Sequence, residues 1–182
     1  KKHDVNVAFD AFLFGSLFIM GFYHLGLYLL RKTDKKSLFF GLSSLILSWR
    51  ILVSGEILVL KVLNMNWELL VKLNFLSIAF IVPAFIMYFK ALFNSESNKY
   101  GILFFNILSF LFAMLVVFTN ALFSSKILYY FHYVIILSIL YFLFVTIRAI
   151  FNKKEGAFIV LIAFTVLAFT ALNDILSVNT FG

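Results

Sequence analysis

The sequence contains no cysteine, one proline and few charged residues, which make up 13% of its 182 residues. Without cysteine, the chain can form neither a disulfide framework nor a thiolate metal site. Apolar residues account for 64% of the chain, and 26 residues are phenylalanine. This composition is far from that of a soluble domain and predicts a membrane protein.

Apolar runs of roughly 20 residues recur along the chain, and each is long enough to cross a hydrocarbon core about 30 Å thick. Six spans are predicted, at residues 8–30, 37–54, 69–93, 100–121, 127–149 and 157–177. Residues 55–68 are too polar to cross and are expected at the membrane surface, with Trp67 as an interfacial anchor. Backbone polar groups inside lipid need internal partners, so the predicted fold class is all-α: one polytopic, membrane-embedded helix bundle over residues 1–182.

Lysine and arginine are concentrated in alternate connections between the predicted spans. Nine of them flank the first, third and fifth connections: Arg31, Lys32, Lys35, Lys36, Lys90, Lys99, Arg148, Lys153 and Lys154. Basic connections face the cytoplasm, so the N-terminus is predicted outside. The net charge of +7 is then explained by topology and anionic lipid and implies no nucleic-acid partner. Six spans also place the C-terminus outside, so the chain is expected to be an excerpt.

Small residues in the first two spans predict close helix packing. The second span places Gly41, Ser44, Ser48 and Gly55 on nearly one face, where another helix can approach. The first span offers similar points at Gly15, Ser16, Gly21 and Gly26. In the third span, Pro83 is expected to kink the helix because its ring removes a backbone hydrogen bond.

Charged residues are predicted to gather toward the outer ends of the spans. Arg50 lies roughly 20 Å into the second span from the cytoplasmic side, and Asp174 lies about 25 Å into the sixth. Asp10, Glu56, Glu68 and Lys72 fall at the same level. A charge inside the bilayer costs on the order of 3 kcal/mol unless it finds a partner or water. These residues are therefore expected to face inward, as a structural ion-pair cluster, a signal-receiving site or an ion pathway.

The histidines do not indicate a metal site. His24 shares a helix face with Gly21 and Tyr28, and His132 lies within the sequence YYFHY, which is predicted to form an aromatic belt at the membrane surface. Neither histidine has a second ligand at metal-binding spacing. No motif for zinc proteolysis, serine nucleophiles, phosphate loops or dinucleotides is present. We therefore expect neither enzymatic activity nor a cofactor.

The sequence resembles the membrane region of the bacterial seven-transmembrane receptors with diverse intracellular signalling modules. The resemblance rests on GFYHLGLYLLRKTDKKSLFFGLSSLILSWRILVSGE (residues 21–56), WELLVKLNFLSIAFIVPAFIMYFKALF (67–93) and LNDILSVN (172–179). It implies a sensor domain before Lys1, a seventh helix after Gly182, and a cytoplasmic output domain, all in a multi-pass protein of the bacterial cytoplasmic membrane. Output domains such as kinases and cyclases often work as dimers, so a homodimer is also implied.

The resemblance gives the charged residues a role as a hypothesis. Arg50, Glu56, Asn173 and Asp174 would form an outer polar cluster that couples the outer ends of the second and sixth spans during signalling. Asp10, Glu68, Lys72 and His24 would support it. The alternative is a transporter or channel for an ion or small solute, but the inner halves of the spans offer few polar groups beyond Asn106, Thr146 and Thr165. A third reading is a purely structural anchor for flanking domains.

Overall fold

The computed structural model describes the backbone of residues 2–54 and 66–180, and it describes the side-chain surroundings of residues 7–54 and 66–173. These residues form six helices. The helices are α1 (Lys2–Leu30), α2 (Lys35–Ser54), α4 (Trp67–Leu92), α5 (Lys99–Phe118), α6 (Ala121–Phe151) and α7 (Ala157–Thr180). Five of them are long and apolar enough to cross a membrane, and α7 contains the shorter apolar stretch Ala157–Asn173. The predicted polytopic all-α bundle is confirmed. Glu56 and Gly55 lie outside the described residues.

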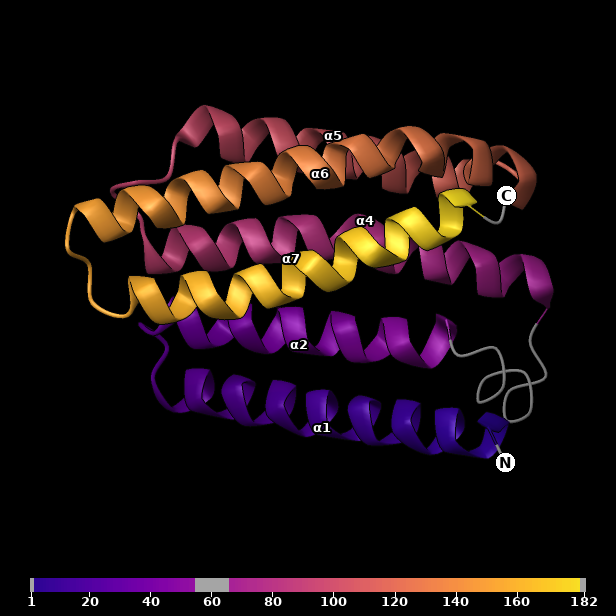
Figure 1. Cartoon of the computed structure of the whole chain (residues 1–182), viewed down its shortest axis with the longest axis horizontal. Coiled ribbons are helices and arrows are strands. Elements are labelled where there is room, and N and C mark those ends of the chain that lie inside the picture. The colour runs from indigo at the N-terminus through magenta and orange to yellow at the C-terminus, as the bar shows by residue number, and fades with distance from the viewer. Residues whose placement is uncertain (1, 55–65, 181–182) are drawn as a thin grey trace.

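The helices run side by side and alternate in direction, with α4 at the centre of the bundle (Figure 1). α4 packs against α2, α5 and α6, α1 packs against α2, and α7 packs against α6. The α1–α2, α4–α5 and α6–α7 connections lie at one end, at the left of Figure 1, and the α5–α6 connection lies at the other. The basic connections therefore share one end of the bundle, as the proposed topology requires. That this end faces the cytoplasm remains a prediction.

Asparagine and aspartate side chains cap the N-termini of four helices. Asn98 Oδ1 accepts a hydrogen bond from the Tyr100 amide at 2.9 Å, and Asn120 Oδ1 accepts one from the Phe123 amide at 2.9 Å. Asn66 does the same at the start of α4, and Asp34 at the start of α2. These side chains satisfy backbone donors that have no partner within the helix. The helices consequently begin before the apolar runs do: α6 starts at Ala121 rather than at residue 127.

Two glycines bring α1 and α2 into backbone contact. A Cβ added at Gly41 would lie 2.9 Å from the Gly21 carbonyl oxygen, and one added at Gly21 would lie 2.7 Å from the Leu45 side chain. Ser44 and Ser48, on the same side of α2, are buried. The predicted packing face of α2 is therefore present in its described part. Close contact at Gly15 and Gly26 was wrongly predicted, because nothing lies within 4 Å of a Cβ at either position.

Gly41→Ala is expected to destabilise the protein by about 1–3 kcal/mol, because the new methyl group would meet the backbone of α1, which cannot rotate away. Thermal unfolding of the purified protein in detergent measures this loss. Gly26→Ala is the matched control, since it adds the same atom to an open position. Equal midpoints for the two variants would contradict the observed contact.

Candidate functional site

A cavity of about 490 Å³ lies among α2, α4, α6 and α7. We call it the central cavity. Most of its wall is apolar, with side chains such as Ile78, Val82 and Ile139. Polar side chains come from all four helices: Arg50, Asn74, Ser125, His132, Ser138 and Thr170. Volume and wall are typical of a site for a small molecule, which is mostly apolar with a few placed polar groups.

Arg50 and Asn74 join α2 to α4 at the part of this cavity that lies away from the basic end of the bundle, which is the outer part in the predicted topology. The Arg50 Nη1 atom donates a hydrogen bond to the Asn74 Oδ1 atom over 3.3 Å. Arg50 lies about 22 Å along α2 from Lys35, and Asn74 lies about 10 Å along α4 from Trp67. Both are half-buried. The sequence placed Arg50 at this level, whereas Asn74 was missed, although it is a polar residue inside an apolar run.

Three phenylalanines pack together at the deeper part of the central cavity. Phe142 and Phe164 line it, and Phe89 packs against both. The ring centroids of Phe89 and Phe142 are 4.7 Å apart, and those of Phe142 and Phe164 are 5.3 Å apart. Offset and edge-to-face rings at these separations attract each other. This phenylalanine cluster therefore holds α4, α6 and α7 together below the polar groups.

His132 lies on the wall of the central cavity rather than in the aromatic belt. It is 8% exposed, whereas Tyr129, Tyr130 and Tyr133 are all exposed. Its Nδ1 atom is buried and has no hydrogen-bond partner among the described residues. One turn of helix directs Phe131 and His132 inward and the three tyrosines outward. The prediction that YYFHY forms a belt at the membrane surface was therefore wrong for His132. The helical periodicity places His132 on a different face from the three tyrosines and would have separated it from them.

α7 presents Thr170 and Ala171 to the central cavity. Asp174 comes one turn later in the same helix, so its backbone lies on the cavity side of α7. The side chains of Asp174 and Glu56 lie outside the described residues, and Asn173 is exposed. The predicted contact between Arg50 and Asp174 therefore remains a prediction.

The four residues that were predicted to support the outer polar cluster lie in three different places. Glu68 and Lys72 form an ion pair with each other along α4, with 3.3 Å between Lys72 Nζ and Glu68 Oε1. Asp10 is half-buried, and the Gly21–Gly41 contact places it across from the last turn of α2. The His24 ring lies 4.5 Å from the Phe40 ring, about 15 Å along α2 from Arg50. The structure therefore does not bring His24 to Arg50.

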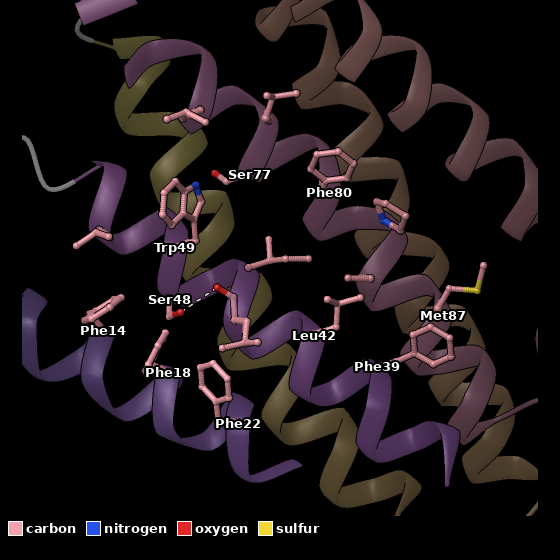
Figure 2. A pocket seen from close by; sticks show the side chains of 17 residues that line it. Phe14, Phe18, Phe22, Phe39, Leu42, Ser48, Trp49, Ser77, Phe80 and Met87 are labelled. Carbon is pink, nitrogen blue, oxygen red and sulfur yellow. Dashed lines mark hydrogen bonds between the residues drawn. The ribbon is translucent and has the colours of Figure 1, made fainter. Parts of the chain in front are cut away.

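A second hollow, of about 830 Å³, opens between α1, α2 and α4 (Figure 2). Figure 2 shows Phe14, Phe18 and Phe22 of α1 along one side and Phe39 and Met87 at one end. Its two serine hydroxyls are already bonded within their own helices: Ser48 to the Leu45 carbonyl and Ser77 to the Asn74 carbonyl. Its wall therefore suits hydrocarbon. Pro83 lies on this wall inside α4, which continues to Leu92; the expected kink remains a prediction.

Glu96 forms a polar cluster at the basic end of the bundle that the sequence did not indicate. The residue is 3% exposed and lies in the α4–α5 connection. Its carboxylate accepts hydrogen bonds from Ser95 Oγ at 2.7 Å and from Asn152 Nδ2 at 3.2 Å, and Lys154 Nζ lies 3.9 Å away. We call these four residues the Glu96 cluster. It ties the α4–α5 connection to the α6–α7 connection.

The surroundings of Glu96 favour its ionised form. Burial raises the pKa of the carboxyl, but the hydrogen bonds from Ser95 and Asn152, its own backbone amide and the charge of Lys154 outweigh burial, so the pKa lies below its ordinary value of 4.5. The turn after α6 brings Lys154 near: Lys153 adopts a positive φ of 53°, and the Lys154 amide bonds back to the Ala149 carbonyl. Glu96 is therefore a carboxylate at neutral pH.

The architecture is that of a multi-pass helical membrane protein with a partly polar cavity among its helices. Among the described residues, no group of three or more histidine, aspartate or glutamate side chains could hold a metal ion. A family model described as "7TM diverse intracellular signalling" matches residues 6–182, and the chain belongs to this family. The resemblance noted from the sequence is thus confirmed, and the chain is a transmembrane receptor region from a receptor family rather than an enzyme family. Searches of the curated proteins and of the solved structures found no match.

Proposed function

We propose that this chain relays an extracytoplasmic signal to a cytoplasmic output domain of the same full-length protein, across the bacterial cytoplasmic membrane. The observation that carries the proposal is the hydrogen bond between Arg50 and Asn74, which joins α2 to α4 within a cavity also walled by α6 and α7. A change at this one polar site would act on four helices at once. A sensor domain outside and a homodimer of the whole receptor belong to the same proposal.

The outer polar cluster of Arg50, Glu56, Asn173 and Asp174 would be the switch. A charge at this depth is costly without partners. If one helix moved, the side chains on the other helices that pair with its charge would therefore have to move with it. Asp174, one turn beyond the cavity residue Thr170, would approach Arg50 in one arrangement of α7 and leave it in another. Asp10, Glu68 and Lys72 would surround the cluster at the outer surface, and His24 would take no part. Signal binding would bias these two arrangements.

The Glu96 cluster would carry the change to the cytoplasmic face. It connects the two loops that follow α4 and α6, the central-cavity helices that descend from the outer end in the proposed topology. A shift of α4 relative to α6 would thus move both loops together. Communication between sites of this kind usually involves a coupling free energy of about 1–3 kcal/mol.

The phenylalanine cluster argues for a receptor and against a pathway for ions. Polar groups of the central cavity come mainly from the outer half, and Phe89, Phe142 and Phe164 pack together on its deeper side. An ion pathway needs polar groups or water through the midplane. Proteoliposomes that contain the full-length protein should therefore show no ion flux above that of empty liposomes, and substantial flux would favour the transporter.

Neutral variants of the outer polar cluster test the relay. Arg50→Gln and Asp174→Asn in the full-length receptor are expected to change basal or stimulated output by roughly 5-fold or more, the lower end of typical allosteric coupling. Lys126→Gln, in an exposed position of α6, is the control and should leave output unchanged. Unchanged basal and stimulated output in both cluster variants, at normal abundance in the membrane, would remove the cluster from the mechanism.

A further inference from the structure

The second hollow, between α1, α2 and α4, is a long apolar surface that no described segment covers. Phe22 of α1, Leu42 of α2 and Phe80 of α4 line it and are 54%, 42% and 51% exposed. Its wall follows α4 from Met87 to Leu73, over about 21 Å. One leaflet contributes about 15 Å of hydrocarbon core, so this wall is long enough for a whole acyl chain.

Two lysines continue this wall at the basic end of the bundle, where Figure 2 shows Phe39 and Met87. Lys90 follows Met87 by about one turn of α4, so it lies on the same helix face. Lys35 precedes Phe39 by about one turn of α2 and likewise lies on the face that lines the hollow. Lys90 is half-buried and Lys35 is exposed. The apolar wall therefore ends in positive charge.

This positive charge is left largely uncompensated by the described part of the chain. Neither Lys35 nor Lys90 forms an ion pair with a described residue. The acid of the α1–α2 connection, Asp34, accepts hydrogen bonds from the Ser37 hydroxyl at 2.7 Å and from the amides of Lys36 and Ser37. Glu96, in the α4–α5 connection, is bonded within its own cluster. An anionic group is the partner that these lysines lack.

We propose that the second hollow binds an anionic phospholipid, with one acyl chain along its apolar wall and the phosphate at Lys35 and Lys90. Basic sites between membrane helices bind head groups of this kind. A second copy of the chain fits less well, because a two-fold axis along the membrane normal would bring the same lysines of both copies to one level. In the predicted topology the lipid belongs to the cytoplasmic leaflet. The proposal does not depend on the relay, since binding alone tests it.

Binding is measured on the full-length receptor in phosphatidylcholine nanodiscs that contain a small share of phosphatidylglycerol with a photoreactive diazirine in one chain. Leu42→Trp fills the hollow from α2 and is expected to reduce the saturable labelling at least about tenfold. Leu140→Trp makes the same change at an exposed position of α6, outside the hollow, and should stay within about twofold of the original protein. Equal labelling of the two variants would overturn the proposal. Absence of labelling in the original protein would mean that another helix covers the hollow and would overturn it as well.

The charge of the head group is tested independently of Leu42→Trp. Unlabelled phosphatidylglycerol should displace the probe, whereas the same share of phosphatidylethanolamine should not; equal displacement by both would indicate ordinary contact with bulk lipid and overturn the proposal. Lys90→Gln should weaken the labelling roughly fivefold, and Lys90→Arg should retain most of it. Lys153→Gln removes one charge from the same end of the bundle but away from the hollow, and should stay within about twofold. A loss as large in Lys153→Gln as in Lys90→Gln would contradict a phosphate site at Lys90.

Discussion

Replacing Arg50 by glutamate is expected to reduce the amount of folded protein in the membrane at least about tenfold. The new carboxylate would face the Asn74 Oδ1 atom, an acceptor that now receives a hydrogen bond from Arg50. A half-buried acid at this depth of a membrane helix, without a partner, costs on the order of 3 kcal/mol.

Quantitative immunoblots of membrane fractions measure this effect. Arg50→Lys keeps the positive charge and should retain most of the protein, although it loses the fork of the guanidinium. Lys126→Glu makes the same reversal of charge at an exposed position near the start of α6 and should have no effect. Normal abundance of the Arg50→Glu protein would contradict the contact of Arg50 with Asn74 inside the membrane.

Replacing Glu96 by alanine is expected to destabilise the folded protein by about 2–3 kcal/mol. The change leaves the Asn152 amide without its bond to the carboxylate and separates the α4–α5 connection from the α6–α7 connection. Thermal unfolding in detergent measures the loss. Glu155→Ala, an exposed acid in the α6–α7 connection, is the control and should change the midpoint little. A midpoint shift no larger than that of Glu155→Ala would contradict the importance of the Glu96 cluster.

The stabilisation by Glu96 also depends on pH in a defined direction. Its pKa is lowered in the folded protein, so the folded state binds the proton less tightly than the unfolded state. The contribution is therefore complete above the ordinary value of 4.5 and is lost as the pH falls through the lower pKa of the folded state. The original protein and Glu96→Gln should consequently differ in midpoint at pH 7 and converge in strongly acidic buffer. A constant difference over that range would contradict an ionised Glu96.

The helices could be predicted from hydropathy because a bilayer demands long apolar segments, but their ends could not. A span predicted from hydropathy ends at the last apolar residue, whereas a helix ends where its backbone donors and acceptors find other partners. α1 starts at Lys2 rather than at residue 8, and α6 extends from Ala121 to Phe151 rather than from 127 to 149. Asn98 and Asn120 are the signals that would have located two of the helix starts.

Some polar residues of the site could be predicted and others could not. The position of a charged residue in a span gives its depth in the membrane, but not which helix its side chain faces. Arg50 could be predicted from its charge and depth. Its contact Asn74 was missed because a neutral amide costs less to bury than a charge and so gives a weaker indication of a partner. His132 needed the phase of its helix, which separates it from the tyrosines beside it. Glu96 lies in a connection, where an acid is ordinarily solvated, and only the meeting of two connections buries it. Tertiary contacts of this kind have no local sequence pattern.

An exchange of charges between α2 and α7 tests the relay most directly. Arg50→Asp and Asp174→Arg each remove one partner of the proposed pair, and the double variant restores opposite charges in reversed positions. Stimulated output of the full-length receptor is measured for all four proteins at matched abundance. The account predicts that each single variant loses the response and that the double variant regains a substantial part of it. A double variant whose loss equals the sum of the two single losses would contradict a direct coupling between α2 and α7 at the outer polar cluster.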